Sequence, residues 1–139
     1  MEKVLEFLKK NNVCTVATSS GDMPRASVID YYVIGNAIIF ATDPNSIKAN
    51  NLQKNNHISM SVQNMPQFVT LDGSVTEPTQ SEIEGYMNQL LINHPEFKEM
   101  MGTDMMQPFA FYKLVIDTAY WNDLSNGMVP TEIIKGNVQ

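Results

Sequence analysis

The chain has 139 residues, which is enough for one domain with a hydrophobic core. Its 15 acidic and 9 basic side chains leave a formal net charge of −6, so a nucleic-acid partner is not expected. No apolar run is long enough to span a bilayer, and residues 1–12 lack the apolar core of a signal peptide. We therefore expect no membrane partner and a cytoplasmic protein. The single cysteine, Cys14, excludes an intramolecular disulfide.

The first half of the chain predicts two helices and three strands. A Gly35-Asn36 pair suits a hairpin turn, because glycine tolerates positive φ at the first central position. Asp43 followed by Pro44 predicts an N-cap and the first turn of a helix. The predicted elements are a helix over residues 1–10, strands over 13–18, 26–34 and 37–41, and a helix from Asp43 to about Asn55.

The second half predicts further strands and one long helix. Thr79 and Glu82 have the spacing of a capping box, and His94-Pro95 ends the helix that follows. Gly73 interrupts a strand and indicates a bulge. The predicted elements are strands over residues 57–63 and 67–76, a helix over 79–93, a short helical or irregular segment over 96–106, strands over 109–116 and 119–123, and a loop and tail from Leu124.

This succession predicts one mainly β domain over residues 1–139. Six or seven short strands, mostly linked as hairpins, favour a small antiparallel barrel with helical caps. The strands are too closely spaced for alternating βαβ units, which disfavours a doubly wound fold.

Four side chains near the second helix form a candidate anion site. A helix N-terminus offers free N–H groups and a partial positive charge. Thr42 and Ser46 add hydroxyls, Lys48 adds a point charge, and Arg25 offers a planar fork for a phosphate. In the alternative interpretation Asp43 and Ser46 only cap the helix, while the two cations are solvated or pair with carboxylates. The residues alone leave both interpretations open.

A set of residues in fixed order adds to this picture. The order is Ala17-Thr18, Pro24-Arg25-x-x-Val28, Phe40-x-Thr42, Ser46-x-Lys48 and Leu52, followed by Leu71-x-Gly73-x-Val75. It resembles the pyridoxamine 5′-phosphate oxidase-like family of FMN-binding split barrels. The likeness is good from Val4 to Glu77 and looser beyond, where a helix and strands still follow in the expected order.

The resemblance implies a six- to seven-stranded antiparallel split β-barrel with short helices, and a homodimer with two FMN sites at its interface. Arg25 and Lys48 would hold the FMN phosphate, with strand backbone along the ring edge. Trp121 would approach the flavin from the second subunit, although core packing is the better interpretation of a lone tryptophan. The implied cofactor-binding residues are Arg25, Ala26, Ser27, Val28, Ala41, Thr42, Ser46, Lys48, Gln67 and Trp121.

The departures from the family pattern narrow the expected activity. In the oxidase proper the strand opened by the arginine carries a lysine five residues later, where this chain has Asp30. The oxidase glutamine before the strand glycine falls on Phe68 here, with Gln67 beside it. The oxidase's C-terminal substrate-binding arginine and histidine are absent, since Lys135 is the sole cation after Lys113. The resemblance therefore implies an FMN-dependent oxidoreductase whose small-molecule substrate and catalytic residues are unknown, rather than a vitamin B6 phosphate oxidase.

Three alternatives stay open: a flavin-binding carrier or sensor without turnover, a protein that holds another anionic cofactor such as the deazaflavin F420 or haem, and a structural dimer with an empty site. A metal site is not predicted, because His57 and His94 lie far apart in the sequence and beside no cysteine or carboxylate cluster. His57 is expected at the surface of a strand start. Cys14 lies in an apolar strand, where an inert thiol is expected.

Overall fold

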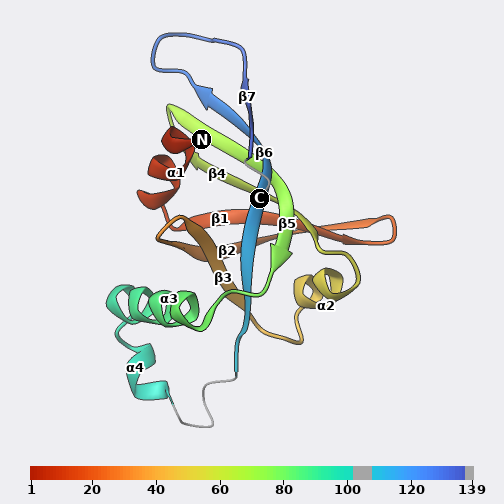
Figure 1. Ribbon diagram of the computed structural model, residues 1–139, viewed down its shortest axis with the longest axis vertical. Helices are drawn as coiled ribbons and strands as arrows, with labels where there is room; N and C mark the ends of the chain where they lie inside the picture. The colour runs from red at the N-terminus through yellow and green to blue at the C-terminus, as the bar shows by residue number, and fades with distance from the viewer. Residues whose placement is uncertain (102–107, 137–139) are drawn as a thin grey trace.

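The computed structural model describes residues 1–101 and 108–136 (Figure 1). Within this part of the chain, seven strands form one antiparallel sheet in the order β3-β2-β1-β4-β5-β6-β7. β3 also pairs with β6, which closes six strands into a barrel and leaves β7 as an added edge strand. The elements are α1 (Glu2–Lys9), β1 (Val13–Ser20), β2 (Met23–Ile34), β3 (Ala37–Thr42), α2 (Ile47–Lys54), β4 (His57–Asn64), β5 (Gln67–Thr76), α3 (Gln80–Asn93), α4 (Phe97–Met100), β6 (Ala110–Asp123) and β7 (Glu132–Lys135).

The predicted fold class is confirmed, and three boundaries differ from the expectation. β2 begins three residues earlier than predicted and includes Pro24 and Arg25. β6 runs without a break through the two strands predicted over 109–116 and 119–123. The segment predicted over 96–106 is helical at Phe97–Met100, and its residues 102–106 lie outside the described residues.

The prediction of a loop and tail from Leu124 is wrong. The short strand β7 pairs with β6 in the register Thr118↔Lys135 to Trp121↔Glu132. The Gly136 N–H then donates to the Asp117 carbonyl at 2.8 Å. The free edge of β6 offers a partner for four residues whose local sequence is too short to indicate a strand on its own.

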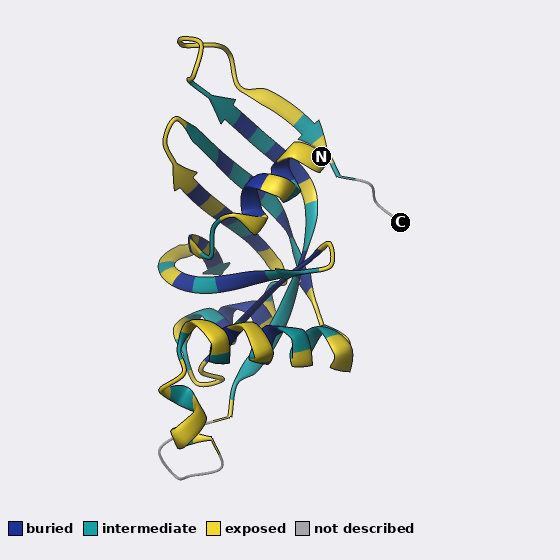
Figure 2. Ribbon diagram, turned by 90° about the vertical axis from the view of Figure 1, so that its left-hand side faces the viewer, coloured by how far each residue is buried: buried dark blue, intermediate teal, exposed yellow. Residues whose placement is uncertain are grey.

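The barrel interior holds the larger of two hydrophobic clusters. Residues along the strands alternate between buried and more exposed, as Figure 2 shows in dark blue against teal and yellow. α1 covers the barrel at one place, where Phe7 packs edge-on against Trp121 with ring centroids 5.4 Å apart. The Tyr31 hydroxyl donates to the Leu8 carbonyl at 2.8 Å. Leu52 brings α2 into the same cluster.

α3 covers the outer face of β2 and β3 and builds the second cluster. Tyr86 packs against Tyr32 with ring centroids 5.1 Å apart, and Leu90 joins them. The predicted capping box is confirmed, since Glu82 N–H donates to Thr79 Oγ1 and Thr79 N–H donates to Glu82 Oε1. Among the helices in the described ranges, none combines the length and apolar character needed to cross a membrane.

The bulge predicted at Gly73 is also confirmed. The β5–β6 register moves from Asp72↔Thr118 to Gly73↔Ile116, so Asp117 has no opposite residue. A Cβ added to Gly73 would lie 2.0 Å from the Val115 carbonyl oxygen. Only glycine permits so close an approach of the two backbones.

The start of α2 differs from the prediction. Its N-cap is Ser46 rather than Asp43: Ser46 Oγ accepts from Ala49 N–H at 3.2 Å. Asp43 instead accepts from Asn45 N–H at 2.8 Å, and Ser46 N–H donates to the Asp43 carbonyl at 3.0 Å. The aspartate thus closes a local turn, a conformation that Asp-Pro sequences favour, and the helix begins three residues later.

Candidate functional site

Three of the predicted phosphate-binding side chains are in direct contact. Lys48 Nζ donates to Thr42 Oγ1 at 2.8 Å, and Thr42 Oγ1 lies 3.3 Å from Ser46 Oγ. Thr42 ends β3, whereas Ser46 and Lys48 belong to the start of α2. The short β3–α2 connection therefore assembles two hydroxyls and an ammonium group beside a helix N-terminus.

Arg25 reaches the same place from β2. It pairs across the strands with Thr18, so the two side chains share one face of the sheet. Thr18 Oγ1 accepts from Asn51 Nδ2 of α2 at 3.1 Å, which identifies that face as the one covered by α2. The Arg25 guanidinium is close enough to help lower the pKa of Lys48, after the larger effect of burial and against the opposing effect of Asp43. We call Arg25, Thr42, Ser46 and Lys48 the cradle.

The cations of the cradle have no carboxylate partner in the described part of the chain. The ion pairs found there involve neither Arg25 nor Lys48. The Asp43 carboxylate, expected to compete for the helix N–H groups, is held by Asn45 instead. An arginine that lowers the pKa of a neighbouring lysine, with no ion pair to either cation among the described residues, is an arrangement that suits an anionic ligand.

β2 presents an unpaired backbone edge next to the cradle. β2 pairs with β1 from Met23 to Asp30, but with β3 only from Tyr31 to Ile34. On the side away from β1, residues 23–30 therefore have no strand partner among the residues that the structure describes, and we call this stretch the open edge. The predicted ring-lining residues Ala26, Ser27 and Val28 lie within it. Alternate N–H and C=O groups of such an edge are available to a planar polar ligand.

Of the other predicted residues, Ala41 directly precedes Thr42 of the cradle, whereas Gln67 and Trp121 lie on β5 and β6. Ala41 stands on β3 at the point where β3 leaves β2, and it is half-buried against the α3 cluster. Gln67 donates to Asp123 Oδ2 at 3.0 Å at the start of β5. Across the sheet, Asp72 is level with Ser59 and Ala17, next to the Thr18 that faces Arg25, and Gln67 is five residues, or about 17 Å, further along β5. Gln67 thus lies away from the cradle of its own chain.

Trp121 is buried in its own chain, with 8% of its surface exposed. Besides packing on Phe7, it lines a surface groove of about 280 Å³ together with Lys3, Asp123 and Glu132. Its ring is therefore part of the core and also borders the surface near the Gln67–Asp123 pair.

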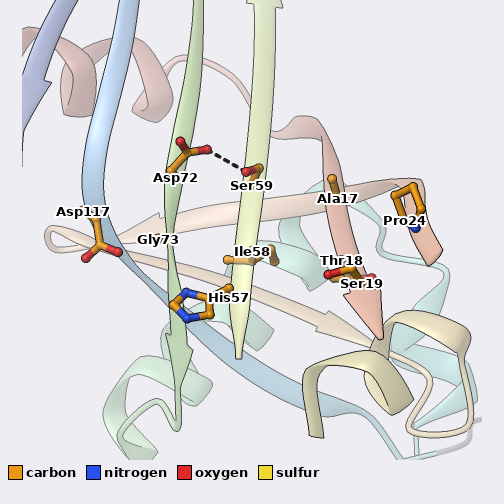
Figure 3. Close-up of a pocket in the computed structure, with 10 residues that line it drawn as sticks. All are labelled: Ala17, Thr18, Ser19, Pro24, His57, Ile58, Ser59, Asp72, Gly73 and Asp117. Carbon is orange, nitrogen blue, oxygen red and sulfur yellow. Dashed lines mark hydrogen bonds between the residues drawn. The ribbon is translucent and has the colours of Figure 1, made fainter. Parts of the chain in front are cut away.

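A second groove, of about 400 Å³, lies beyond β1 on the side opposite to the open edge (Figure 3). The β1–β2 hairpin supplies one wall, and β4, β5 and the bulged Asp117 supply the rest. Ser59 is hydrogen-bonded to Asp72 Oδ1 at 2.6 Å, and His57 is exposed at the start of β4 as expected. In the two described ranges, no three His, Cys, Asp or Glu side chains lie close enough to hold a metal ion. Burial raises the pKa of the Cys14 thiol to about 12, which makes this thiol unreactive.

The sequence did not reveal the side chains that fix α2 against the barrel. These are the buried Thr18–Asn51 bond and the contacts of Asn55 Nδ2 with the Ser19 carbonyl at 3.4 Å and hydroxyl at 3.3 Å. The polar spacing of Asn51 and Asn55, one helical turn apart, was the available signal.

Comparison with known proteins agrees with this architecture. The family model described as pyridoxamine 5′-phosphate oxidase matches residues 1–122. The fold and the cradle define a split-barrel protein, and the chain belongs to the pyridoxamine 5′-phosphate oxidase family. No curated protein matches the sequence.

Several solved structures share the fold at low sequence identity. A conserved hypothetical protein of Mycobacterium tuberculosis matches 98% of this chain and 92% of its own, with a TM-score of 0.76 and 19% identity. A FAD-binding protein of Mesorhizobium loti matches 85% of this chain and 88% of its own, with a TM-score of 0.66 and 16% identity. A haem-binding protein of Mycobacterium smegmatis matches 95% of this chain, with a TM-score of 0.70 and 20% identity. The match spans about half of that longer protein, 55% of its length.

Proposed function

We propose that this protein binds FMN and acts as an FMN-dependent oxidoreductase on a small molecule. The observation that carries the proposal is the pair of cations, Arg25 and Lys48, which form no ion pair within the described residues and lie beside the open edge of β2. A phosphate fits the cradle because it accepts charge-assisted hydrogen bonds from both cations and from the hydroxyls of Thr42 and Ser46.

The surroundings of the open edge suit a flat aromatic ring. Three apolar side chains are more than half exposed, two on the open edge, Met23 at 71% and Val28 at 71%, and one at the first residue of α2, Ile47 at 55%. Exposed apolar groups beside unpaired backbone polar groups match a ring system with an apolar face and a polar edge. FMN, when bound, supplies the two-electron redox chemistry. The chain's own residues bind and orient it, so no catalytic acid or base is required of them.

The proposal includes a homodimer with flavin sites at the interface. The outer face of β1 and β2 presents small or apolar side chains to solvent, with the carboxylate of Asp30, opposite Val13, at one end. Val13 is 52% exposed, and the cross-strand pairs Thr15↔Val28 and Ala17↔Ala26 continue the same face. Such a surface suits burial against a second copy. In that arrangement Gln67 and Trp121, remote from the cradle in one chain, act from the second subunit.

A flavin titration tests the proposal. The purified protein is examined for a visible flavin spectrum, stripped, and titrated with FMN while flavin fluorescence is recorded. Saturable binding with one FMN per chain is expected, as is a solution mass twice that of one chain. A protein that binds no FMN would overturn the proposal. A spectrum characteristic of haem or of a deazaflavin would show that the cofactor is not FMN. Haem is included because one similar structure is a haem-binding protein.

Turnover is tested separately. FMN-loaded protein is mixed with NADH or NADPH under anaerobic conditions, and flavin bleaching is followed. Bleaching followed by reoxidation supports an oxidoreductase. Stable binding with no bleaching by either donor would instead leave a flavin carrier or sensor.

A further inference from the structure

The open edge of β2 ends at Asp30. The β2–β3 pairing begins one residue later, at Tyr31↔Phe40. On the outer face of the sheet Tyr32 is already covered by α3, whereas Val28 is 71% exposed. Asp30 belongs to the same face as Val28 and Tyr32, because alternate residues of a strand share a face. It therefore marks the boundary between the covered and the open part of β2, with 39% of its side chain exposed.

The corner after α3 lies against this boundary. His94 Nε2 is 3.6 Å from Asp30 Oδ2, and His94 Nδ1 is 3.4 Å from Glu96 Oε1. Asn93 Nδ2 donates to the Tyr32 hydroxyl at 3.2 Å. The His94 side chain is 36% exposed. Neither carboxylate pairs with a lysine or arginine in the part of the chain that is described.

The charge thus changes sign along the open edge. Arg25, on the face covered by α2, and Lys48 stand at one end, whereas Asp30, on the opposite face, stands with Glu96 at the other. Five residues of extended strand separate Arg25 from Asp30, which is about 17 Å. A ligand with a phosphate in the cradle and a ring along the edge extends toward the acidic end. Any second molecule that meets that ring then does so close to Asp30.

We propose that Asp30, positioned by His94, sets the charge preference for the substrate: the site admits neutral or cationic aromatic molecules and disfavours anionic ones, phosphorylated substrates included. The inference rests on the proposed FMN site. A carboxylate without a lysine or arginine partner attracts a cation and repels an anion, and the repulsion grows as a bound ring displaces water. Specificity by repulsion needs no tight contact with the preferred molecule.

Three probes of similar shape and different charge test the proposal. Nicotinate, nicotinamide and 1-methylnicotinamide are titrated into FMN-loaded protein at fixed ionic strength, and the change in flavin absorption gives each dissociation constant. In the wild-type protein the cation is expected to bind most tightly and the anion most weakly, with about two- to fivefold between successive probes for a partly exposed charge. Asp30→Asn is expected to remove this difference, and Asp30→Lys to reverse it.

His94→Gln separates substrate selection from a purely structural role. Loss of the imidazole leaves the Asp30 carboxylate without its neighbour, so the preference for the cation is expected to increase. A role limited to holding α3 predicts a change in stability with an unchanged order of probes. Glu84→Gln removes one carboxylate charge, as Asp30→Asn does, but from an exposed position on α3. It serves as the control for Asp30→Asn.

The outcomes distinguish this inference from the proposed function. Wild-type protein that binds no FMN contradicts the proposed function itself. FMN binding with the same probe order in the wild type, Asp30→Asn and Asp30→Lys overturns the inference and leaves the cofactor proposal intact. If neither the neutral nor the cationic probe binds to the FMN-loaded protein, the inference about Asp30 is overturned as well.

Discussion

Asn51 Nδ2 donates to Thr18 Oγ1 at 3.1 Å, and both side chains are more than nine-tenths buried. This bond joins α2, which carries Lys48, to the strand position opposite Arg25. The two cations of the cradle come from different elements, and the bond holds those elements together. The placement of the cradle thus depends on a polar contact in the protein interior.

Replacement of Thr18 by valine tests that dependence. The variant leaves the Asn51 amide buried without its acceptor, which is expected to reduce the free energy of unfolding by about 1–3 kcal/mol. The affinity for FMN is also expected to fall, because α2 loses the hydrogen bond that holds it against β1. Urea unfolding and FMN titration measure the two effects. Thr76→Val, at the exposed end of β5, is the control; equal behaviour of the two variants would contradict the argument.

Removal of either cation is expected to weaken FMN binding. Arg25→Ala and Lys48→Ala each lose a charge-assisted hydrogen bond to the phosphate, a loss of about 1.5–3 kcal/mol or roughly tenfold to a hundredfold in affinity. Lys54→Ala removes an equal charge from the last turn of α2 and is expected to bind FMN as the wild type does. An unchanged dissociation constant in both cradle variants would rule out this phosphate site.

The pKa of Lys48 predicts a pH-dependent stability difference in the protein without FMN. Burial and Arg25 lower this pKa below its usual 10.5, so the charged amine is less stable in the folded protein than in the unfolded chain. That cost is fully present below the lowered pKa and disappears as the pH rises toward 10.5. Lys48→Met is therefore expected to be as stable as the wild type or more stable at pH 7, with the advantage lost at alkaline pH.

Urea unfolding from neutral to alkaline pH measures the stability difference between the wild type and Lys48→Met. The same measurement with FMN added gives a second comparison. At one fixed FMN concentration, FMN is expected to raise the unfolding midpoint of the wild type more than that of Lys48→Met. A variant that is clearly less stable at neutral pH would show that the Lys48–Thr42 hydrogen bond outweighs the electrostatic cost.

Gly73 is expected to tolerate no side chain. Its added Cβ would meet backbone, the Val115 carbonyl at 2.0 Å, which cannot rotate away. Gly73→Ala is expected to destabilise the fold by about 3 kcal/mol, at the upper end of the usual cost of overpacking. Denaturant unfolding measures the loss. Ser74→Ala, one residue further along β5, is the comparison, and similar midpoints for the two variants would mean that the bulge can relax.

Local signals in the sequence were sufficient for most of the elements. Alternation along β4 and β5, the turn at Gly35 and the capping box at Thr79 depend on neighbouring residues, and each was confirmed. β7 was missed because its four residues are ordered by pairing with β6. Asp43 was mistaken for the N-cap because Asp-Pro suits both a turn and a helix start, and only the position of α2 against β1 distinguishes them.

The candidate site was also predictable only in part from the sequence. The order of Arg25, Thr42, Ser46 and Lys48 along the chain indicated a phosphate-binding motif, since family patterns are preserved in residue types and spacing. Only the tertiary structure decided that, among residues 1–101 and 108–136, the two cations form no ion pair with a carboxylate and the edge of β2 is open beside them. It also placed Asp30 at the end of that edge with His94 against it. These relations join residues far apart in the chain, so they arise from barrel closure and helix packing, which no local pattern encodes.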